Sequence, residues 1–215
     1  AEKLGYEYGG ISEHSKSAHY ANGLSEERLR KQWKELDQLE KKFKKIRIFR
    51  GTESDILADG SLDYSDSVLK SFDFVVGSIH SRFQMSEGEM TKRISQAMEH
   101  PAMTIWGHPT GRLRLGRAGY AVDYDAIFEV AKKHGVAIEI NANPHRLDLD
   151  WRVCKKAKAF GLRFSINPDA HSLEGLDDVV FGVCIARKGW LEKADILNTM
   201  SVGEMEQFLK SRKKW

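Results

Sequence analysis

Short hydrophobic runs alternate along the chain with longer stretches in which apolar residues recur every three or four positions. The short runs are rich in β-branched and aromatic residues, which predicts strands at residues 6–12, 46–51, 74–79, 103–106, 136–140 and 163–166. The longer stretches predict helices at residues 24–43, 86–99, 124–134 and 151–160. Gly135 and Gly161 directly follow two of these helices and suit a left-handed turn back into a strand.

This alternation indicates the fold class. Strands that alternate with helices of about 10–15 residues are typical of βα units and a parallel sheet. No Pro- or Ser-rich linker divides the units, so residues 1–215 are predicted to form a single α/β domain of about six βα units. Residues 1–5 have the pattern of a last helical turn ending at Gly5, and the chain does not begin with Met. We therefore expect a piece of a longer protein that extends on its N-terminal side.

The composition excludes several classes of protein. A hydrophobic fraction of 41% and a charged fraction of 30% are typical of globular domains. The longest apolar run, residues 179–186, is far shorter than the roughly 20 residues that a membrane-spanning helix needs. The net charge of +3 is too weak to indicate a polyanionic partner by itself. Only two cysteines are present, too few for a disulfide framework, which favours the reducing cytoplasm.

Ionisable side chains stand at the end of every predicted strand. In order along the chain they are Glu13, His14, Glu53, Asp55, His80, His108, Glu139, Asp169 and His171. In a parallel barrel all strand carboxyl ends lie on one face, and sites are built there. Carboxylates and imidazoles packed together are costly to bury unless they ligate metal ions. A single histidine of this kind is typical of a core or surface group, but four in different units indicate a centre for Zn²⁺, Mn²⁺ or Fe.

The loop at residues 107–120 is the second polar feature. It reads GHPTGRLRLGRAGY and holds Arg112, Arg114 and Arg117 beside His108. Guanidinium groups next to a metal site suit phosphate capture, although a solvated basic loop has the same composition. Two or three metal ions beside such a loop would suit phosphoester hydrolysis. Competing designs are missing: the sequence has no G-x-S-x-G elbow, no H-E-x-x-H pair, no dinucleotide fingerprint and no P-loop ending.

Several longer strings resemble a known family. They are SEHSKSAHYANGLSEERL, GTESDILADGSLD, SIHSRF, GHPTGRL, INANPHRLDLDW, NPDAHS and ARKGWLEKADILNT. Together they resemble the PHP (polymerase and histidinol phosphatase) domain, and more narrowly the PHP domain at the C-terminus of bacterial and archaeal family X DNA polymerases. The resemblance runs from about residue 6 to residue 199.

The resemblance implies a distorted (β/α)7 barrel, similar to a TIM barrel, with up to three divalent metal ions on its C-terminal face. It implies that Glu53 bridges two metals and that His80 and His108 complete the site of the second. It further implies that Asp169 binds the first metal, that His14 and His171 are ligands, and that Arg112 matches a loop arginine of the family. The implied catalytic residues are Glu53, His80, Asp169 and Arg112, and the implied metals are Mn²⁺ or Zn²⁺, with Fe as a further option.

Two departures from the family pattern stand out. The family opens with a strand that ends in His-x-His and supplies two ligands, and neither this motif nor a further downstream ligand is present, so we expect the first strand to be missing. The site of Glu53, His80 and His108 can still be complete. Glu13 stands where the family usually has Asp, which can alter hydrogen bonding around His14, and Pro168 stands where Thr is common.

Three functions follow from the resemblance and the residues. The first is a metal-dependent phosphoesterase acting on DNA, with 3′→5′ exonuclease and related 3′-end and abasic-site processing, preceded in the parent chain by a polymerase module. The second is a small-molecule phosphatase of the histidinol-phosphate type, which shares the ligand set. The third is a metal-stabilised scaffold without catalysis. Because ligands are missing, we expect the chain as given to be weakly active or inactive.

Overall fold

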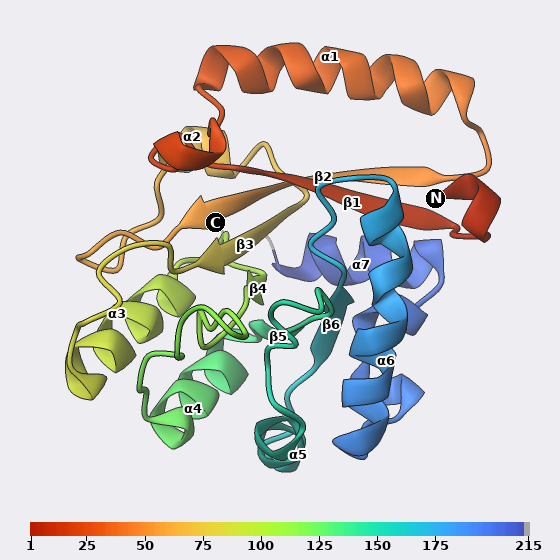
Figure 1. Ribbon diagram of the computed structural model, residues 1–215. Coiled ribbons are helices and arrows are strands. Elements are labelled where there is room, and N and C mark those ends of the chain that lie inside the picture. Colours follow the sequence, from red (N-terminus) through yellow and green to blue (C-terminus); the bar gives the residue numbers. More distant parts are fainter. Residues whose placement is uncertain (213–215) are drawn as a thin grey trace.

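A parallel sheet organises the fold of the computed structural model, which describes residues 1–212. Its strands are β1 (Tyr8–His14), β2 (Arg47–Asp55), β3 (Phe74–Ser78), β4 (Ile105–Trp106), β5 (Ala137–Asn141) and β6 (Phe164–Asn167). The strands lie in the sheet in the order of the sequence, and every neighbouring pair is parallel. This topology curls the sheet into part of a barrel (Figure 1).

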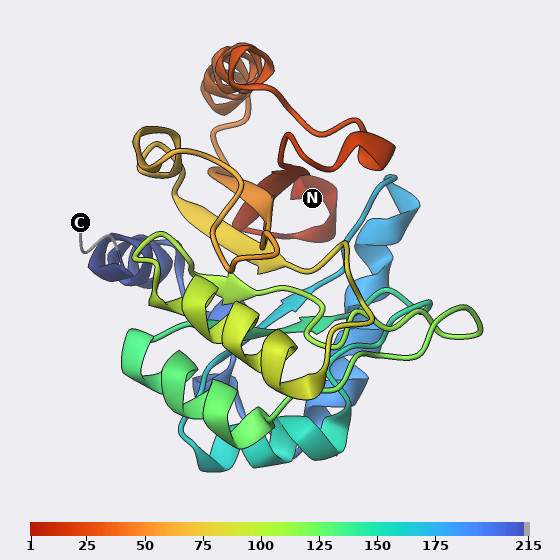
Figure 2. The same ribbon diagram turned by 90° about the vertical axis from the view of Figure 1, so that its left-hand side faces the viewer.

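Helices cover the outer, convex side of the curled sheet. They are α1 (Glu26–Lys42), α2 (Asp66–Leu69), α3 (Glu87–Glu99), α4 (Tyr124–His134), α5 (Trp151–Ala159) and α6 (Val179–Lys188). The last helix, α7 (Val202–Arg212), packs instead on the inner face of the sheet. Figures 1 and 2 show α3, α4 and α5 on one flank of the sheet and α1 apart from them, across β1 and β2. The predicted fold class, an α/β barrel of the distorted TIM-like type with about six βα units, is confirmed by the six parallel strands, which form a curled half-barrel.

The local signals in the sequence explain where elements begin and end. Ser86 starts α3 with a capping box, in which its hydroxyl accepts the Glu89 N–H while the Glu89 carboxylate accepts the Ser86 N–H. Gly135 and Gly161 adopt the left-handed conformation with φ of 66° and 80°, as expected after a helix. Residues 1–5 also end as predicted, although the turn before Gly5 is a 3-10 turn, Glu2–Leu4.

Side-chain alternation along the strands divides the interior of the curled sheet into two zones. Phe49 and Glu53 on β2 lie four residues apart, so they point to the same face. Near Phe49 this face is apolar, and it packs against Val76, Ile105, Ala137 and the α7 residues Met205 and Leu209. Near Glu53, at the carboxyl ends of the strands, the same face is polar. Helix α7 therefore closes the amino-terminal end of the barrel, and the ionisable side chains lie at the other end.

Phe74 shapes the sheet between these two zones. Its ring covers Gly10 on β1 and Gly51 on β2, where an added Cβ would lie 2.7 Å and 2.2 Å from the ring. A larger side chain at either glycine would displace the aromatic ring and push apart the strands that carry His14 and Glu53.

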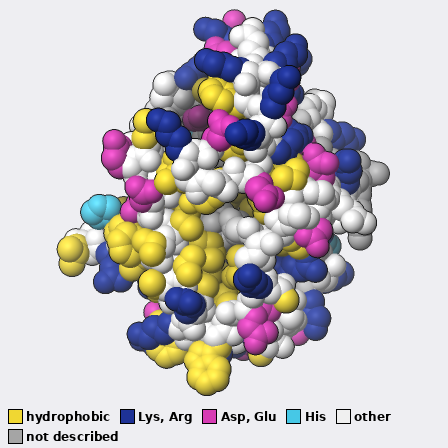
Figure 3. Space-filling view, turned by 90° about the vertical axis from the view of Figure 1, so that its right-hand side faces the viewer, with side chains coloured by type: hydrophobic (Ala, Val, Ile, Leu, Met, Phe, Trp, Pro, Cys, Tyr) yellow, Lys and Arg dark blue, Asp and Glu magenta, His cyan; other side chains and the backbone are white. Residues whose placement is uncertain are grey.

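Apolar side chains remain exposed over α6. Val180, Phe181 and Val183 are 55%, 44% and 37% exposed, and Figure 3 shows hydrophobic side chains gathered on this face. Within residues 1–212, none of the helices combines the length and the apolar composition that crossing a bilayer requires.

Candidate metal centre

Glu53 lies at the middle of a cluster of three histidines. Its Oε1 atom lies 2.9 Å from Nε2 of His108 and 3.3 Å from Nε2 of His80, and those two nitrogens are 3.1 Å apart. Its Oε2 atom lies 3.2 Å from Nδ1 of His14. Oε1 therefore faces two imidazole nitrogens, of His80 and His108, and Oε2 faces a third, of His14.

The parallel sheet brings these residues together from distant parts of the chain. His14 ends β1 and lies beside Glu53 in the strand register, while His80 and His108 follow β3 and β4 by two residues each. Because parallel strands share the same direction, residues that follow them meet at one edge. The predicted convergence of His14, Glu53, His80 and His108 at one end of the sheet is present in the structure. Their roles as metal ligands remain a prediction.

Asp55 orients His80. Its Oδ1 pairs with Nδ1 of His80, and its Oδ2 accepts a hydrogen bond of 3.0 Å from the Ser17 hydroxyl. With Nδ1 occupied in this way, Nε2 of His80 faces Glu53 and His108. A carboxylate behind a histidine in this manner is the usual support of a metal-ligating imidazole. From the sequence, Asp55 is one of the strand-end residues and has no assigned function. The one sequence signal for its position is its spacing of two residues from Glu53, which places both side chains on the same face of the strand.

The charges of the cluster are strongly coupled. Burial by itself raises the pKa of Glu53, but hydrogen bonds from His108 and His80 outweigh this effect and hold it well below its usual range. Burial lowers the pKa of His80, whereas hydrogen bonds to Asp55 and Glu53 raise it, with a net result of about 9. Burial lowers the pKa of His14. The cluster therefore combines an ionised carboxylate with imidazoles of unlike basicity.

The donor set fits a divalent cation. Ligand atoms of His14, Glu53 and His80 lie within 4.8 Å of one another, and Nδ1 of His14 is buried without a hydrogen-bond partner although it lies near Glu53. Around Oε1 of Glu53, the Nε2 atoms of His108 and His80 lie 2.9 Å and 3.3 Å away, and these two nitrogens are 3.1 Å apart. Imidazole nitrogens and carboxylate oxygens without thiolate suit Zn²⁺, Mn²⁺ or Fe.

Asp169 and His171 lie beside this cluster. The His171 ring is 6.1 Å from that of His14, and its side chain is 70% exposed, with Nδ1 3.7 Å from Oδ1 of Asp169. Oδ2 of Asp169 accepts a hydrogen bond of 3.0 Å from the Asn141 amide and lies 3.4 Å from Nε of Arg146. Asp169 and His171 are thus at the same end of the sheet as the cluster. The Asp169 carboxylate is paired with Arg146, a residue that the sequence did not indicate.

Glu139 is a further residue that received no role from the sequence. Burial raises its pKa to about 7. Its Oε1 accepts a hydrogen bond of 2.8 Å from the Asn167 amide, and its Oε2 accepts the backbone N–H of His108. Glu139 thereby fixes the backbone from which His108 projects. A carboxylate within the otherwise apolar stretch 136–140, on a strand buried at every position, is the signal that points to it.

The Arg112 side chain is bonded to the backbone of residues 146 and 147. Its guanidinium donates to the backbone carbonyls of Arg146 and Leu147, at 2.9 Å for the Nε bond to Arg146. Arg112 therefore holds the segment that carries Arg146, and Arg146 in turn reaches Asp169. The assignment of Arg112 to phosphate capture remains a prediction, and Arg146 is the arginine that contacts a candidate ligand.

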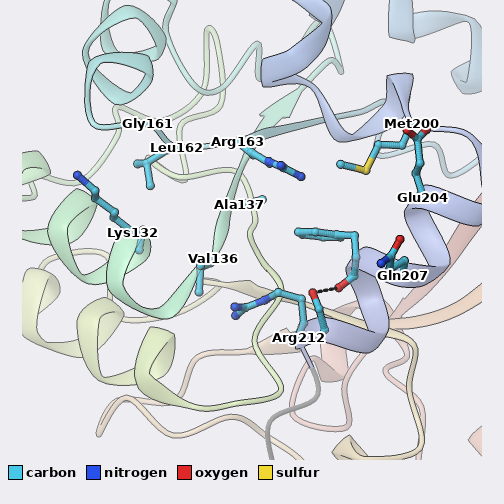
Figure 4. A pocket seen from close by; sticks show the side chains of 14 residues that line it. Lys132, Val136, Ala137, Gly161, Leu162, Arg163, Met200, Glu204, Gln207 and Arg212 are labelled. Carbon is cyan, nitrogen blue, oxygen red and sulfur yellow. Dashed lines mark hydrogen bonds between the residues drawn. The ribbon is translucent and has the colours of Figure 1, made fainter.

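A pocket of about 530 Å³ lies at the opposite end of the barrel (Figure 4). It is lined by residues from the end of α4, the segments that lead into β5 and β6, and α7, including Lys132, Val136, Arg163 and Arg212. Because the predicted site residues all lie at the carboxyl ends of the strands, this pocket is separate from the cluster.

Comparison with known proteins shows relatives over most of the chain. No family model matches the sequence. The chain is 48% identical over 208 residues to the DNA polymerase/3′-5′ exonuclease PolX of Bacillus subtilis, which covers 97% of the chain and 36% of the relative. It is 28% identical over 189 residues to a probable phosphatase of Thermoanaerobacter sp., covering 83% of the chain and 74% of the relative. The sequence resemblance is thereby confirmed. Over 97% of its length the chain is similar to a stretch of PolX, in agreement with the resemblance to the PHP domain of these polymerases.

The chain spans about a third of the length of the PolX relative that it matches.

The position of Glu13 shows how one departure from the PHP pattern is accommodated. Its Oε1 accepts a hydrogen bond of 3.2 Å from the Gln32 amide on α1, so its side chain points away from the cluster. Strand alternation explains this, because Glu13 and His14 are adjacent on β1 and point to opposite faces. The expected effect of Glu13 on the surroundings of His14 is therefore not present in the structure.

Proposed function

We propose that this PHP domain is a metal-dependent phosphoesterase that acts on 3′ ends of DNA. The observation that carries the proposal is the placement of Glu53, whose two oxygens face separate imidazole sets. A carboxylate in this position suits a bridge between two cations, and paired metal sites are the common design for phosphoester hydrolysis. The 48% identity to a relative named as a 3′-5′ exonuclease supports nucleic acid as the substrate class.

In this proposal some residues hold the cations, others position the ligands, and one binds the substrate phosphate. Glu53, His80 and His108 would hold one cation, and His14 with the other Glu53 oxygen would contribute to a second. A divalent cation there supplies Lewis-acid polarisation of the phosphoryl group and of the attacking water. Asp55 holds the imidazole of His80 in place, and Glu139 does the same for the backbone of His108. Arg146 adds a positive charge beside Asp169, where a substrate phosphate can bind.

An exposed aromatic side chain supports a nucleic-acid substrate. Tyr20 follows β1 in the turn His19–Ala21 and is 69% exposed. Its ring centroid lies 6.0 Å from those of both His14 and His80. A base of a single strand can stack on such a ring, which would place the adjoining phosphate over the cluster.

Loss of Glu53 or His80 is the direct test. In the longer protein that carries this chain, Glu53→Ala and His80→Ala should each lower Mn²⁺-stimulated release of nucleotides from a DNA 3′ end by more than about 100-fold, because even residues that support a ligand cost 10–100-fold. Glu129→Ala, an exposed carboxylate on α4, is the matched control and should keep the wild-type rate. Wild-type turnover in both cluster variants would contradict the assignment.

A small-molecule phosphatase is the second candidate, since a relative over 83% of the chain carries the name probable phosphatase. Both candidates use the same ligands, so the substrate must separate them. Faster hydrolysis of a nucleotide diester than of a phosphate monoester supports the nuclease, and the reverse order supports the phosphatase. Bound metal with turnover of neither substrate would favour a scaffold.

A further inference from the structure

The loop between β4 and α4 forms a finger, which we define as residues 107–120. It follows β4 directly, and its first members include the candidate ligand His108. Figure 2 shows it, in green, projecting beyond the body on the side toward which the strand arrows point. Loops longer than about 12–15 residues without secondary structure of their own are uncommon in compact domains, and most of them are functional.

Hydrogen bonds hold the finger in one shape. The Tyr120 N–H donates to the Thr110 carbonyl at 3.0 Å, and Leu113 and Arg117 exchange backbone hydrogen bonds of 2.9 Å and 2.8 Å, as in a hairpin. The Arg117 guanidinium donates to the Gly111 carbonyl at 2.7 Å and lies 3.8 Å from the Phe83 ring centroid. The tip, residues 114–116, is therefore presented on a braced stem.

Leu115 at this tip carries two structural costs. Its side chain is fully exposed to solvent, which leaves apolar surface in water. Its backbone is in the left-handed conformation with φ of 64°, which is unfavourable for a leucine and easily adopted by glycine or asparagine. Leu115 is the most exposed large hydrophobic residue of the described chain. Within residues 1–212 this side chain is not buried, so its apolar surface is available for contact with a partner molecule.

The finger is connected to the candidate metal centre and is positively charged. Arg112 in its stem donates to the Arg146 carbonyl, and Arg146 reaches the Asp169 carboxylate. Arg114 in the tip is exposed, and its backbone N–H donates to the His145 carbonyl at 2.6 Å. An exposed Leu115 with Arg114 and Arg117 near it matches the way proteins insert an apolar wedge between base pairs while arginines hold the phosphates.

We propose that Leu115 is a wedge that separates the terminal base pairs of duplex DNA so that the unpaired 3′ strand can enter the metal centre. This inference rests on the proposed nuclease function. The cluster lies at the carboxyl ends of the strands. In this proposal the end of a DNA duplex must open before one of its strands can stack on Tyr20 and lie over Glu53. The wedge is needed for duplex ends only and is not needed for a strand that is already single.

The first experiment compares two substrates. Leu115→Asn retains a residue that tolerates the left-handed conformation and removes the apolar side chain. It should keep the wild-type rate on a single-stranded 3′ end and lose at least about tenfold on a blunt duplex, since base unstacking is the step it impairs. Val180→Asn, an exposed apolar residue on α6, is the matched control and should change neither rate. Equal rates of Leu115→Asn and wild type on the duplex, or an equal loss on both substrates, would overturn the wedge.

A second experiment is independent of catalysis. With Ca²⁺ in place of Mn²⁺, a duplex carrying 2-aminopurine at its 3′ end should gain fluorescence on binding the wild-type protein and not on binding Leu115→Asn. If the wild type hydrolyses neither substrate, the proposed function fails, and this measurement still decides the wedge. No fluorescence change with the wild type overturns it. The melting temperature of Leu115→Asn should equal or exceed that of the wild type, and a clear fall would assign Leu115 a structural role instead.

Discussion

Individual side chains at the strand ends carry the chemistry through their partners. His80 shows this most clearly, because Asp55 holds one ring nitrogen while the other faces Glu53 and His108. The same contacts raise the pKa of His80 to about 9 despite its burial. In the metal-free protein His80 therefore carries a proton at neutral pH, and that proton occupies a nitrogen that a cation would need.

Metal affinity should consequently depend on pH. The pKa of about 9 in the folded protein lies above the usual histidine pKa of 6.5, so the stabilisation from protonated His80 is fully present below pH 6.5 and is lost as pH rises through 9. A cation must displace this proton, and the Mn²⁺ dissociation constant should fall about tenfold per pH unit between 6.5 and 9. Calorimetry in two buffers of different ionisation enthalpy should show about one proton released per cation. An affinity that does not change over this range would contradict the coupling.

Sequence reasoning predicted the convergence of the ionisable residues but not their pairing. His14, Glu53, His80 and His108 were found because each follows a recognisable strand. The Asp55–His80 and Asp169–Arg146 pairs depend on side-chain direction across segments far apart in the chain, which strand order alone does not specify. Tyr20 and Arg146 lie in turns without periodicity, so no local pattern marked them.

At the scale of elements, hydrophobic periodicity predicted a helix correctly where one side of the helix is polar. Helix α4 has the predicted bounds, residues 124–134, because its apolar residues recur on one face above a charged opposite face. Helices α6 and α7 were not predicted. The run 179–186 that begins α6 is apolar on all sides, so it has no helical stripe to recognise. Strand β2 extends to Asp55, four residues beyond the predicted end, because the polar residues that end the apolar pattern still belong to the sheet.

Two helical glycines provide a test of how closely α6 packs on the sheet. An added Cβ at Gly182 would lie 2.6 Å from Cγ2 of Ile166 and 2.8 Å from Cβ of Ala142, whereas at Gly203 in α7 nothing lies within 4 Å. Gly182→Ala should lower the free energy of unfolding by about 1–3 kcal/mol through overpacking. Gly203→Ala should raise it by up to about 1 kcal/mol through helix propensity. Urea unfolding of both variants checks this, and an increase for Gly182→Ala would show that α6 is free to move from the sheet.

At the scale of the whole molecule, the two edges of the sheet differ. A barrel that is not closed has two strand edges. On the outer side of β6, the Asn198 side chain accepts from the Ile166 N–H at 2.7 Å and donates to the Ile166 carbonyl at 2.9 Å, so this edge is partly covered. Within residues 1–212, no strand pairs with the outer side of β1. The exposed apolar residues of α6 lie on the face shown in Figure 3.

An unpaired edge and an apolar helix face together favour self-association of this chain. The average mass measured by sedimentation should therefore rise with protein concentration. Phe181→Lys, which places a charge on the α6 face, should shift the association to higher concentration, and Glu129→Lys on α4 is a matched control that should leave it unchanged. A monomer at every concentration, in wild type and variants alike, would show that neither surface promotes association.

The convergence of imidazoles on Glu53 is tested most directly by diffraction from crystals of the protein grown with Mn²⁺, with data collected at the manganese absorption edge. The account predicts an anomalous peak within coordination distance of Oε1 of Glu53 and the Nε2 atoms of His80 and His108, and its loss in His80→Ala. A peak elsewhere on the molecule, or none near Glu53 while the side chains remain as described, would contradict it.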